Sequence, residues 1–210
     1  MRKENFETAL KIGRPVARQA KESGKPHIAS ECPLAAVHIL QGIEKLGGEA
    51  PAEVGPAATL HFESFETMRM QVQEMLHIER GGPAQLPGEL DAYNPLVPGG
   101  SELVATVLFE IDDPERRAAF LAKLGGVEET AYIEIEGRKI RGVSEADQDR
   151  TSAEGKASSV QFVHFPFTPG EIALFRKPGS RIVVGFDHPT YPHMTVMPED
   201  VRAALVGDFA

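Results

Sequence analysis

The chain has 210 residues, of which 41% are hydrophobic and 25% are charged, and its formal net charge at pH 7 is −9. This length and composition are sufficient for a globular protein with a core of its own. The negative charge argues against a general nucleic-acid-binding protein, because phosphate binding needs a basic surface. No apolar run approaches the roughly 20 residues that span a bilayer, so membrane insertion is not expected.

Cysteine usage and the amino terminus indicate the compartment. Cys32 is the only cysteine, which excludes an internal disulfide framework. The amino terminus is charged and lacks the hydrophobic stretch of a signal peptide. We therefore expect a cytoplasmic protein.

The first part of the chain predicts a small α/β segment. Apolar spacing indicates a helical stretch over Asn5–Glu22, kinked or divided into two short helices by Gly13 and Pro15, and then a short strand over His27–Ser30. A second helix is expected to begin at Pro33 and to end at Gly47. Residues 49–58 are rich in Pro, Ala and Gly and predict a linker.

The next segment predicts a strand, a long helix and a long loop. Thr59–Phe62 is the expected strand, and the helix is expected to run from its cap at Ser64 to about Arg80. Gly81–Ser101 is rich in Gly and Pro and predicts a long ordered loop or two turns. The apolar positions of the predicted helix are Phe65, Met68, Val72 and Met75.

The rest of the chain alternates between β-prone and helical segments. Several strands joined by hairpins, with helices at the ends, predict an α+β fold, a mainly antiparallel sheet with helices packed on it. The expected elements are a strand over Leu103–Ile111, a helix from Pro114, a hairpin over Ala131–Val143, a mobile loop over Ser144–Ser158, strands over Val160–Phe167 and Arg181–Phe186 with helical turns over Pro169–Phe175 between them, and a helix over Glu199–Phe209.

Four runs of residues resemble a known family. They are Gln71–Arg80, Glu89–Leu96, Val160–Phe165 and Asp187–Tyr191. From about residue 55 to residue 210, the chain is similar to the domain of unknown function 3501 family. Genes of this bacterial family typically lie beside genes for a rubrerythrin-like protein and a cysteine-rich iron–sulfur oxidoreductase. The resemblance implies an accessory role in such a redox system, with one of these proteins as partner.

Residues 2–48 resemble a different protein. Lys3–Glu7, Lys11–Pro15 and Ser30–Ala35 are similar to the carboxyl-terminal end of a CCG domain, the cysteine-rich domain of heterodisulfide reductase-like iron–sulfur oxidoreductases. In those domains, a cysteine at the position of Cys32 joins upstream cysteines in holding a cluster or zinc. The resemblances predict a truncated CCG-like tail over residues 1–48, a linker over 49–58 and the family domain over 59–210.

Cys32 is a candidate reactive thiol, because a helix amino terminus favours the thiolate. A four-cysteine iron–sulfur cluster needs about four protein ligands, so no self-contained cluster is expected. A buried, inert cysteine is the favoured interpretation.

Histidines and carboxylates provide the second candidate site. His164, His188 and His193 are candidate ligands for zinc or iron, since imidazole suits both metals. No pair has the i, i+4 spacing of a helical metal motif, and hydrogen-bonded structural histidines are the alternative. Asp187 and His188 are the candidate catalytic pair, because a carboxylate can orient a histidine for acid–base work.

The long helix and the segment after it supply candidate binding residues. His77 and Glu79 point about 200° apart on a helix, so one metal is not expected to bind both. Glu79 is expected to form a buried ion pair with Arg80 or another arginine, and both Glu79 and Arg80 are candidate binding residues. Tyr93 and Asn94 belong either to a turn with Tyr93 as its anchor or to a binding loop.

These features leave three functions open. The leading interpretation is a non-enzymatic accessory protein of a rubrerythrin and iron–sulfur oxidoreductase system. The alternatives are a metal-dependent enzyme with a His/carboxylate site and a small-molecule binding module. The sequence contains no motif of hydrolases, kinases or dehydrogenases, and the residues do not decide whether the protein is an enzyme or forms homo-oligomers.

Overall fold

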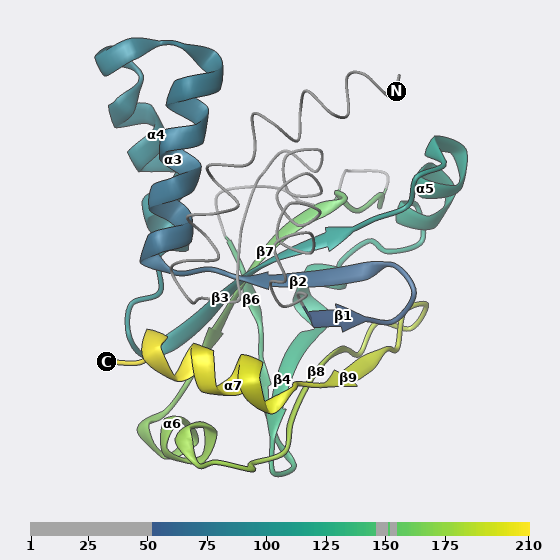
Figure 1. The fold of residues 1–210 in the computed structure, drawn as a ribbon. Helices are drawn as coiled ribbons and strands as arrows, with labels where there is room; N and C mark the ends of the chain where they lie inside the picture. Colours follow the sequence, from purple (N-terminus) through teal and green to yellow (C-terminus); the bar gives the residue numbers. More distant parts are fainter. Residues whose placement is uncertain (1–51, 146–150, 152–154) are drawn as a thin grey trace. The chain divides into compact units, whose positions relative to one another are not determined.

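The structure is a computed structural model that describes residues 52–145, 151 and 155–210. The described chain forms two compact units, which are treated separately (Figure 1). The sheet unit contains Ala52–Ser64 and Leu96–Ala210, and the hairpin unit contains Phe65–Pro95. The predicted amino-terminal α/β segment, including Cys32, lies outside the described residues, as does most of the predicted loop Ser144–Ser158.

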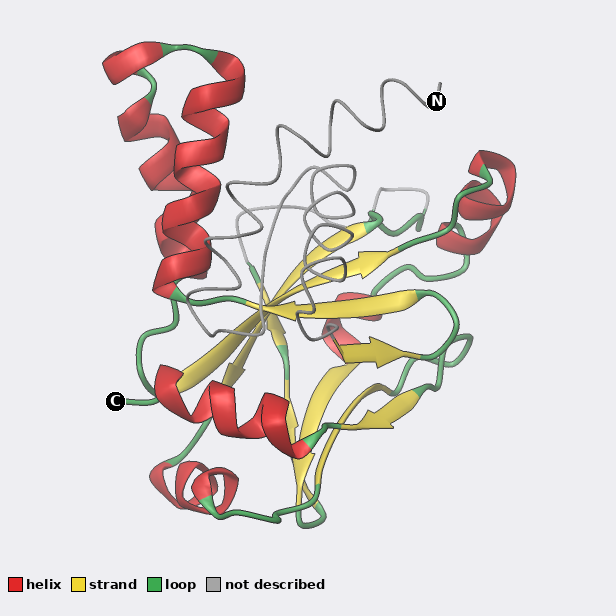
Figure 2. Ribbon diagram, viewed as in Figure 1, coloured by secondary structure: helices red, strands yellow, loops and turns green. Residues whose placement is uncertain are grey.

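The sheet unit contains two antiparallel sheets, which confirms the predicted α+β fold with mainly antiparallel strands (Figure 2). Sheet A has the order β1 (Ala52–Val54), β2 (Ala58–Phe62), β3 (Glu102–Phe109), β7 (Val160–Pro166) and β6 (Val143–Ser144). Sheet B has the order β5 (Arg138–Arg141), β4 (Ala131–Ile135), β8 (Ile182–Phe186) and β9 (Met194–Val196).

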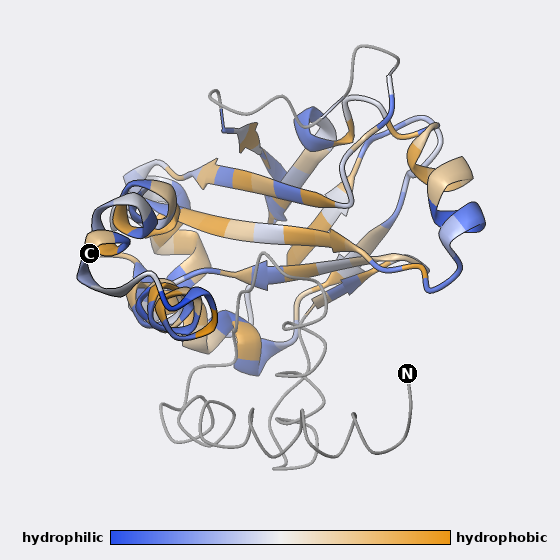
Figure 3. Ribbon diagram, turned by 90° about the horizontal axis from the view of Figure 1, so that it is seen from above, coloured by the Kyte–Doolittle hydropathy of each residue, from blue (hydrophilic) through white to orange (hydrophobic). Residues whose placement is uncertain are grey.

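Alternate residues of the two sheets meet in one hydrophobic core. Side chains of neighbouring strand residues point to opposite faces, so every second residue can be buried between the sheets. The strands carry most of the apolar colour in Figure 3. The central core residues include Leu60, Phe62, Leu103, Ala105, Val107, Ile133, Ile135, Val163, Phe165, Ile182, Val184 and Phe186.

The chain passes directly from sheet B to sheet A at Gly142. This residue joins β5 to β6, and its N–H donates to the carbonyl of Ala131 at 2.9 Å. A Cβ at this position would collide with a methyl group of Val163. Only glycine therefore allows the backbone to turn this close to β7.

The described part of the sheet unit contains three α-helices, and two of them begin with a side-chain cap. In α5 (Pro114–Leu121), the carboxylate of Asp113 accepts from the N–H of Arg116 at 2.7 Å. In α6 (Pro169–Arg176), Thr168 and Glu171 form a capping box. The hydrogen bonds from Thr168 lower the pKa of Glu171, so this carboxylate stays charged at the positive end of the helix dipole. The last helix is α7 (Glu199–Leu205), and short 3₁₀ turns lie at Val127–Thr130 and Val206–Asp208.

The hairpin unit differs from its prediction in one element. The long helix is confirmed as α3 (Phe65–Glu79), but Phe65, the first of its apolar positions, is exposed. The predicted long loop is wrong, because Leu86–Tyr93 forms helix α4. Short 3₁₀ turns lie before α4, at Gly82–Ala84, and after it, at Asn94–Leu96.

Most other predicted elements are present, and two strands were not expected. The hairpin turn at Glu136-Gly137 is confirmed: both residues have positive φ, at 49° and 81°, as a two-residue type I′ turn requires. Ala52–Val54 form β1, where the sequence predicts a linker, and Met194–Val196 form β9. Both strands are three residues long and exist through pairing with β2 and β8.

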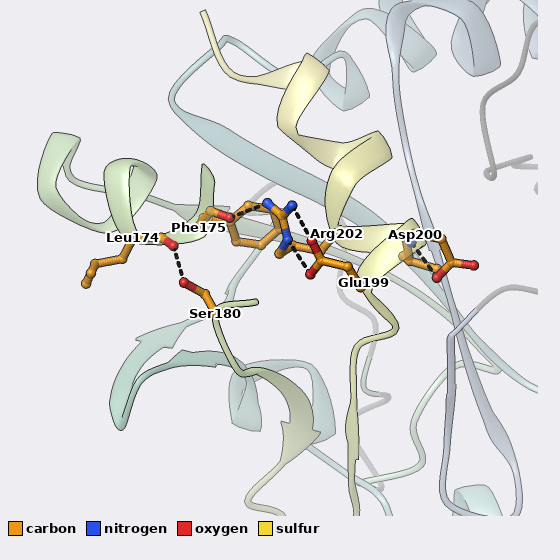
Figure 4. Close-up of polar contacts among 7 residues, drawn as sticks. Leu174, Phe175, Ser180, Glu199, Asp200 and Arg202 are labelled. Carbon is orange, nitrogen blue, oxygen red and sulfur yellow. Dashed lines mark hydrogen bonds and ion pairs between the residues drawn. The ribbon is translucent and has the colours of Figure 1, made fainter. Parts of the chain in front are cut away.

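Arg202 connects α7 to α6 (Figure 4). Its side chain is buried and makes two hydrogen bonds to the carboxylate of Glu199, at 2.7 and 2.8 Å, and a third to the carbonyl of Phe175 at 2.7 Å. The hydrogen bonds to Arg202 lower the pKa of Glu199. Because the guanidinium satisfies a buried carbonyl as well as a carboxylate, it is a structural cation and not a surface charge.

We expect Arg202→Met to lower the free energy of unfolding by about 2–3 kcal/mol, because the buried carbonyl of Phe175 loses its donor. Urea denaturation followed by circular dichroism measures the change. The matched control is Arg69→Met, which removes an exposed i, i+3 pair with Glu66 and should cost less than about 0.5 kcal/mol. Equal losses in both variants would contradict a structural role for Arg202.

Candidate functional site

Asp187, a predicted catalytic residue, forms ion pairs on sheet B. Its carboxylate lies 2.9 Å from the Nζ of Lys139 and 2.7 Å from a guanidinium nitrogen of Arg141. The hydrogen bond from Lys139 is the main cause of a lowered pKa of Asp187. Lys139 also lies over the ring of Tyr132, 3.8 Å from its centroid. Asp187 therefore binds two cations of β5, and its contacts do not orient His188.

His188 is buried and uses both ring nitrogens in contacts with the backbone. The Nε2 lies 3.2 Å from the carbonyl of Gly125, which can only accept, so Nε2 carries the proton. The Nδ1 accepts from the backbone N–H of Thr190 at 3.3 Å. The hydroxyl of Thr190 in turn donates to the carbonyl of Lys123 at 2.8 Å. These bonds attach the segment after β8 to the turn after α5.

Tyr191 joins the two sheets on the side away from Gly142. Its hydroxyl donates to the carbonyl of Val54 at 2.6 Å and accepts from the N–H groups of Ala57 and Ala58 at 3.1 and 3.0 Å. Gly55 lies beneath it with φ of +71°, and a Cβ there would meet the ring of His193 and the hydroxyl of Tyr191. Burial raises the pKa of Tyr191, which keeps the hydroxyl protonated as a donor.

The predicted metal ligands are not gathered in one place. His193 packs against the ring of Tyr191, with 4.4 Å between ring centroids, while His188 bonds Gly125 and His164 bonds Glu102 on β3. Within the described ranges, no group of three or more His, Cys, Asp or Glu side chains could hold a metal ion. In this part of the chain the three histidines thus have three different environments.

His164 and Glu102 form a carboxylate–imidazole pair on sheet A. Strand register places both on the face opposite the hydrophobic core, which we call the second face of sheet A. The Nδ1 of His164 lies 3.1 Å from one oxygen of Glu102, and the other oxygen accepts from the N–H of Gly99 at 3.2 Å. Both side chains are partly exposed, at 21% and 27%. This is the arrangement in which a carboxylate orients an imidazole.

The second face of sheet A also carries buried polar residues that the sequence analysis missed. Thr106 donates to the carboxylate of Glu63 at 2.5 Å, and His61 is paired with Thr106 across β2 and β3. All three side chains are buried. The signal was the alternation of Thr59-Leu60-His61-Phe62-Glu63, in which every second residue is polar on a strand whose other face is apolar.

The loop that orients Glu102 is held by the end of the chain. The N–H of Ala210 donates to the carbonyl of Gly100 at 2.8 Å. Arg176 donates to the carbonyl oxygens of Phe209 and Ala210, both at 3.2 Å. Phe209 packs edge-to-face against two other phenylalanines, Phe167 and Phe175. Contacts therefore run without a break from Arg202 and α6, through Phe209 and Ala210, to the loop that bonds Glu102.

The predicted binding residues of the hairpin unit have mostly structural contacts. Glu79 is exposed and accepts from the side chain of Gln85 at 2.7 Å, so the predicted buried pair with Arg80 is wrong. Arg80 follows α3 with φ of +56°, the left-handed conformation that ends many helices. His77 is exposed on the last turn of α3.

Tyr93 and Asn94 lie at the end of α4. Tyr93 is buried, and its hydroxyl accepts from the side chain of Gln71 on α3 at 3.3 Å. Asn94 is exposed and begins a 3₁₀ turn. Tyr93 thus anchors one helix of the hairpin to the other, which agrees with the anchoring interpretation and not with a loop.

Comparisons with known proteins identify the family. Residues 40–209 match the family model described as "Protein of unknown function (DUF3501)". The chain belongs to this family. The match begins at residue 40, earlier than the predicted start near 55 and inside the stretch assigned to the CCG-like tail.

A solved structure resembles this DUF3501 protein along most of its length. It is the crystal structure of a novel protein of unknown function from Burkholderia pseudomallei K96243, with a TM-score of 0.71 and 31% sequence identity. The likeness covers 87% of this chain and 96% of that chain. No curated protein shows significant sequence similarity to the chain. In the part that the structure describes, no helix combines the length and apolar character needed to cross a membrane.

We expect Tyr191→Phe to lower the free energy of unfolding by about 3 kcal/mol, because one buried carbonyl and two buried N–H groups lose their partner. Thermal and urea denaturation measure the loss. Tyr132→Phe is the matched control, since the Tyr132 hydroxyl has no hydrogen-bond partner among the described residues, and its cost should stay below about 1 kcal/mol. A Tyr191→Phe protein as stable as wild type would contradict the claim that the Tyr191 hydroxyl holds the two sheets together.

The Asp187 ion pairs should give the protein a pH-dependent stability. The pKa of Asp187 is lowered in the folded state, so its contribution is present above the unfolded pKa and is lost as pH falls through the folded pKa. The difference in unfolding free energy between wild type and Asp187→Asn should therefore be largest near neutral pH and shrink below about pH 4. Urea denaturation of wild type and Asp187→Asn at several pH values measures this difference. A difference that is constant with pH would contradict the ion-pair assignment.

Proposed function

We propose that this protein is a non-enzymatic accessory protein of a bacterial, cytoplasmic redox system, and that it binds an iron–sulfur oxidoreductase of the CCG type through the α3–α4 hairpin. The observation that carries the proposal is the set of exposed apolar side chains on the hairpin. Ile78 is 59% exposed, and Leu86 and Leu90 are each 39% exposed. These side chains lie on the two helices of one hairpin, and a contiguous patch of exposed apolar side chains is a frequent mark of a protein–protein contact.

The spacing of these residues suits a helix that packs against a partner. Leu86 and Leu90 are four residues apart on α4, so they lie on the same side of the helix. Full burial of a leucine or isoleucine side chain stabilises by about 1.5–3 kcal/mol. The neighbouring His77, Glu79 and Arg80 are exposed and polar, which is the composition of an interface rim around an apolar centre.

The α3–α4 hairpin has hydrogen bonds of its own at its turn. The side-chain amide of Gln85 donates to Glu79 at 2.7 Å and to Glu89 at 2.8 Å, while its oxygen accepts from the N–H of Gly81 at 2.9 Å. Gln85 therefore connects the end of α3, the turn and the start of α4. A surface that is already in its bound shape loses less conformational entropy on binding.

The choice of partner rests on sequence resemblance. Residues 2–48 resemble the end of a CCG domain, and genes of the family typically accompany such an oxidoreductase and a rubrerythrin-like protein. We take the oxidoreductase as the partner and the rubrerythrin-like protein as the alternative. The two are distinguished by measuring each purified protein separately.

We expect Ile78→Glu and Leu90→Glu each to weaken binding of the oxidoreductase by at least about tenfold, because each places a charge in an apolar contact. Isothermal titration calorimetry with the full-length chain measures the dissociation constant. The matched control is Met194→Glu, which changes an exposed apolar residue of β9 in the sheet unit and should leave binding unchanged.

Two outcomes would contradict the proposal. One is no binding of wild type to either redox protein at micromolar concentration. The other is equal binding by the hairpin variants and wild type. Circular dichroism of each variant shows whether the total helix content of the chain is unchanged.

A further inference from the structure

In the pair formed by Glu102 and His164, both carboxylate oxygens of Glu102 and the Nδ1 of His164 take part in hydrogen bonds. One oxygen of Glu102 is bonded to the N–H of Gly99 and the other to the Nδ1 of His164. An ionised carboxylate can only accept, so the Nδ1 of His164 carries the proton in this pair. In the neutral ring the lone pair then lies on Nε2.

The second ring nitrogen of His164, Nε2, differs from Nδ1 in its contacts. Nowhere in the described ranges does it have a hydrogen-bond partner, and the side chain is 21% exposed. His188 provides the contrast within the same chain, because both of its nitrogens bond the backbone and the residue is buried. The two histidines thus differ in the property that proton transfer needs, which is a free lone pair held in a fixed direction.

The surroundings of His164 indicate the class of ligand. Val143 of β6 is paired with His164 across the sheet and is 56% exposed, and Val104 is its partner on the other side. The exposed apolar side chain of Val143 therefore lies next to His164 on the same face of the sheet, whereas Val104 is buried. A small molecule with an apolar body and a weakly acidic O–H or S–H group matches both features.

We propose that Glu102 and His164 form a proton-accepting site for such a molecule on the second face of sheet A. The Nε2 of His164 takes the proton from the O–H or S–H group, whose bonding electrons stay on the oxygen or sulfur. The ligand becomes an anion, and the imidazole becomes an imidazolium whose charge is stabilised by Glu102. Glu102 is a positioning residue, since it acts through His164.

The ring tautomer tests the arrangement before any ligand is added. Nitrogen-15 NMR of the histidine side chains in the full-length protein should show the Nδ1–H tautomer for neutral His164 and the Nε2–H tautomer for His188. Glu102→Gln should remove the preference at His164 and leave His188 unchanged. Glu110→Gln is the matched control, because Glu110 bonds Thr59 and not a histidine. A predominant Nε2–H tautomer of His164 in wild type would overturn the proposal.

The ligand class is tested with 4-nitrophenol, whose anion absorbs visible light while the neutral phenol does not. Wild type and Glu110→Gln should generate bound nitrophenolate with a one-to-one endpoint. His164→Gln and Glu102→Gln should weaken this signal by about tenfold, the effect of losing one charge-assisted hydrogen bond. No signal from wild type, or an equal signal from His164→Gln, would overturn the proposal.

Discussion

The hydroxyl of Tyr191 is the interaction on which the architecture of the sheet unit depends. On one side the two sheets are joined covalently, because the chain runs from β5 to β6 through Gly142. On the other side the β1–β2 turn meets the β8–β9 connection, and Tyr191 bonds Val54, Ala57 and Ala58 there. A short edge strand such as β1 has few ladder bonds of its own, so this contact holds it in register.

The same segment explains why several residues with catalytic potential have structural roles. Asp187 binds two cations of β5, His188 bonds the turn after α5, and Tyr191 joins the sheets. These three side chains each bond a different segment. Glu102 and His164 differ, because the contacts that fix Glu102 come from a loop held by Ala210, and among the described residues Nε2 of His164 has no hydrogen-bond partner.

Local sequence signals predicted the elements that depend on local physics. Pro114 and Pro169 open helices, and Glu136-Gly137 forms the hairpin turn, because these positions set the backbone themselves. Helix α4 was missed since Pro87 and Gly88 suggest a loop, although proline is tolerated in a first helical turn. The partners of His188 and Tyr191 lie 63 and 137 residues away, so no local pattern could indicate them.

Amide hydrogen exchange at Ala57 and Ala58 tests the closure of the two sheets most directly. Their N–H groups donate to the Tyr191 hydroxyl at 3.1 and 3.0 Å. Without this contact, the two N–H groups would donate to water. If this contact holds the sheets together, both amides exchange as slowly as the central amides of β3, through global unfolding alone. Fast exchange of both amides while β3 stays protected would show that the β1–β2 turn opens by itself, and would contradict the account.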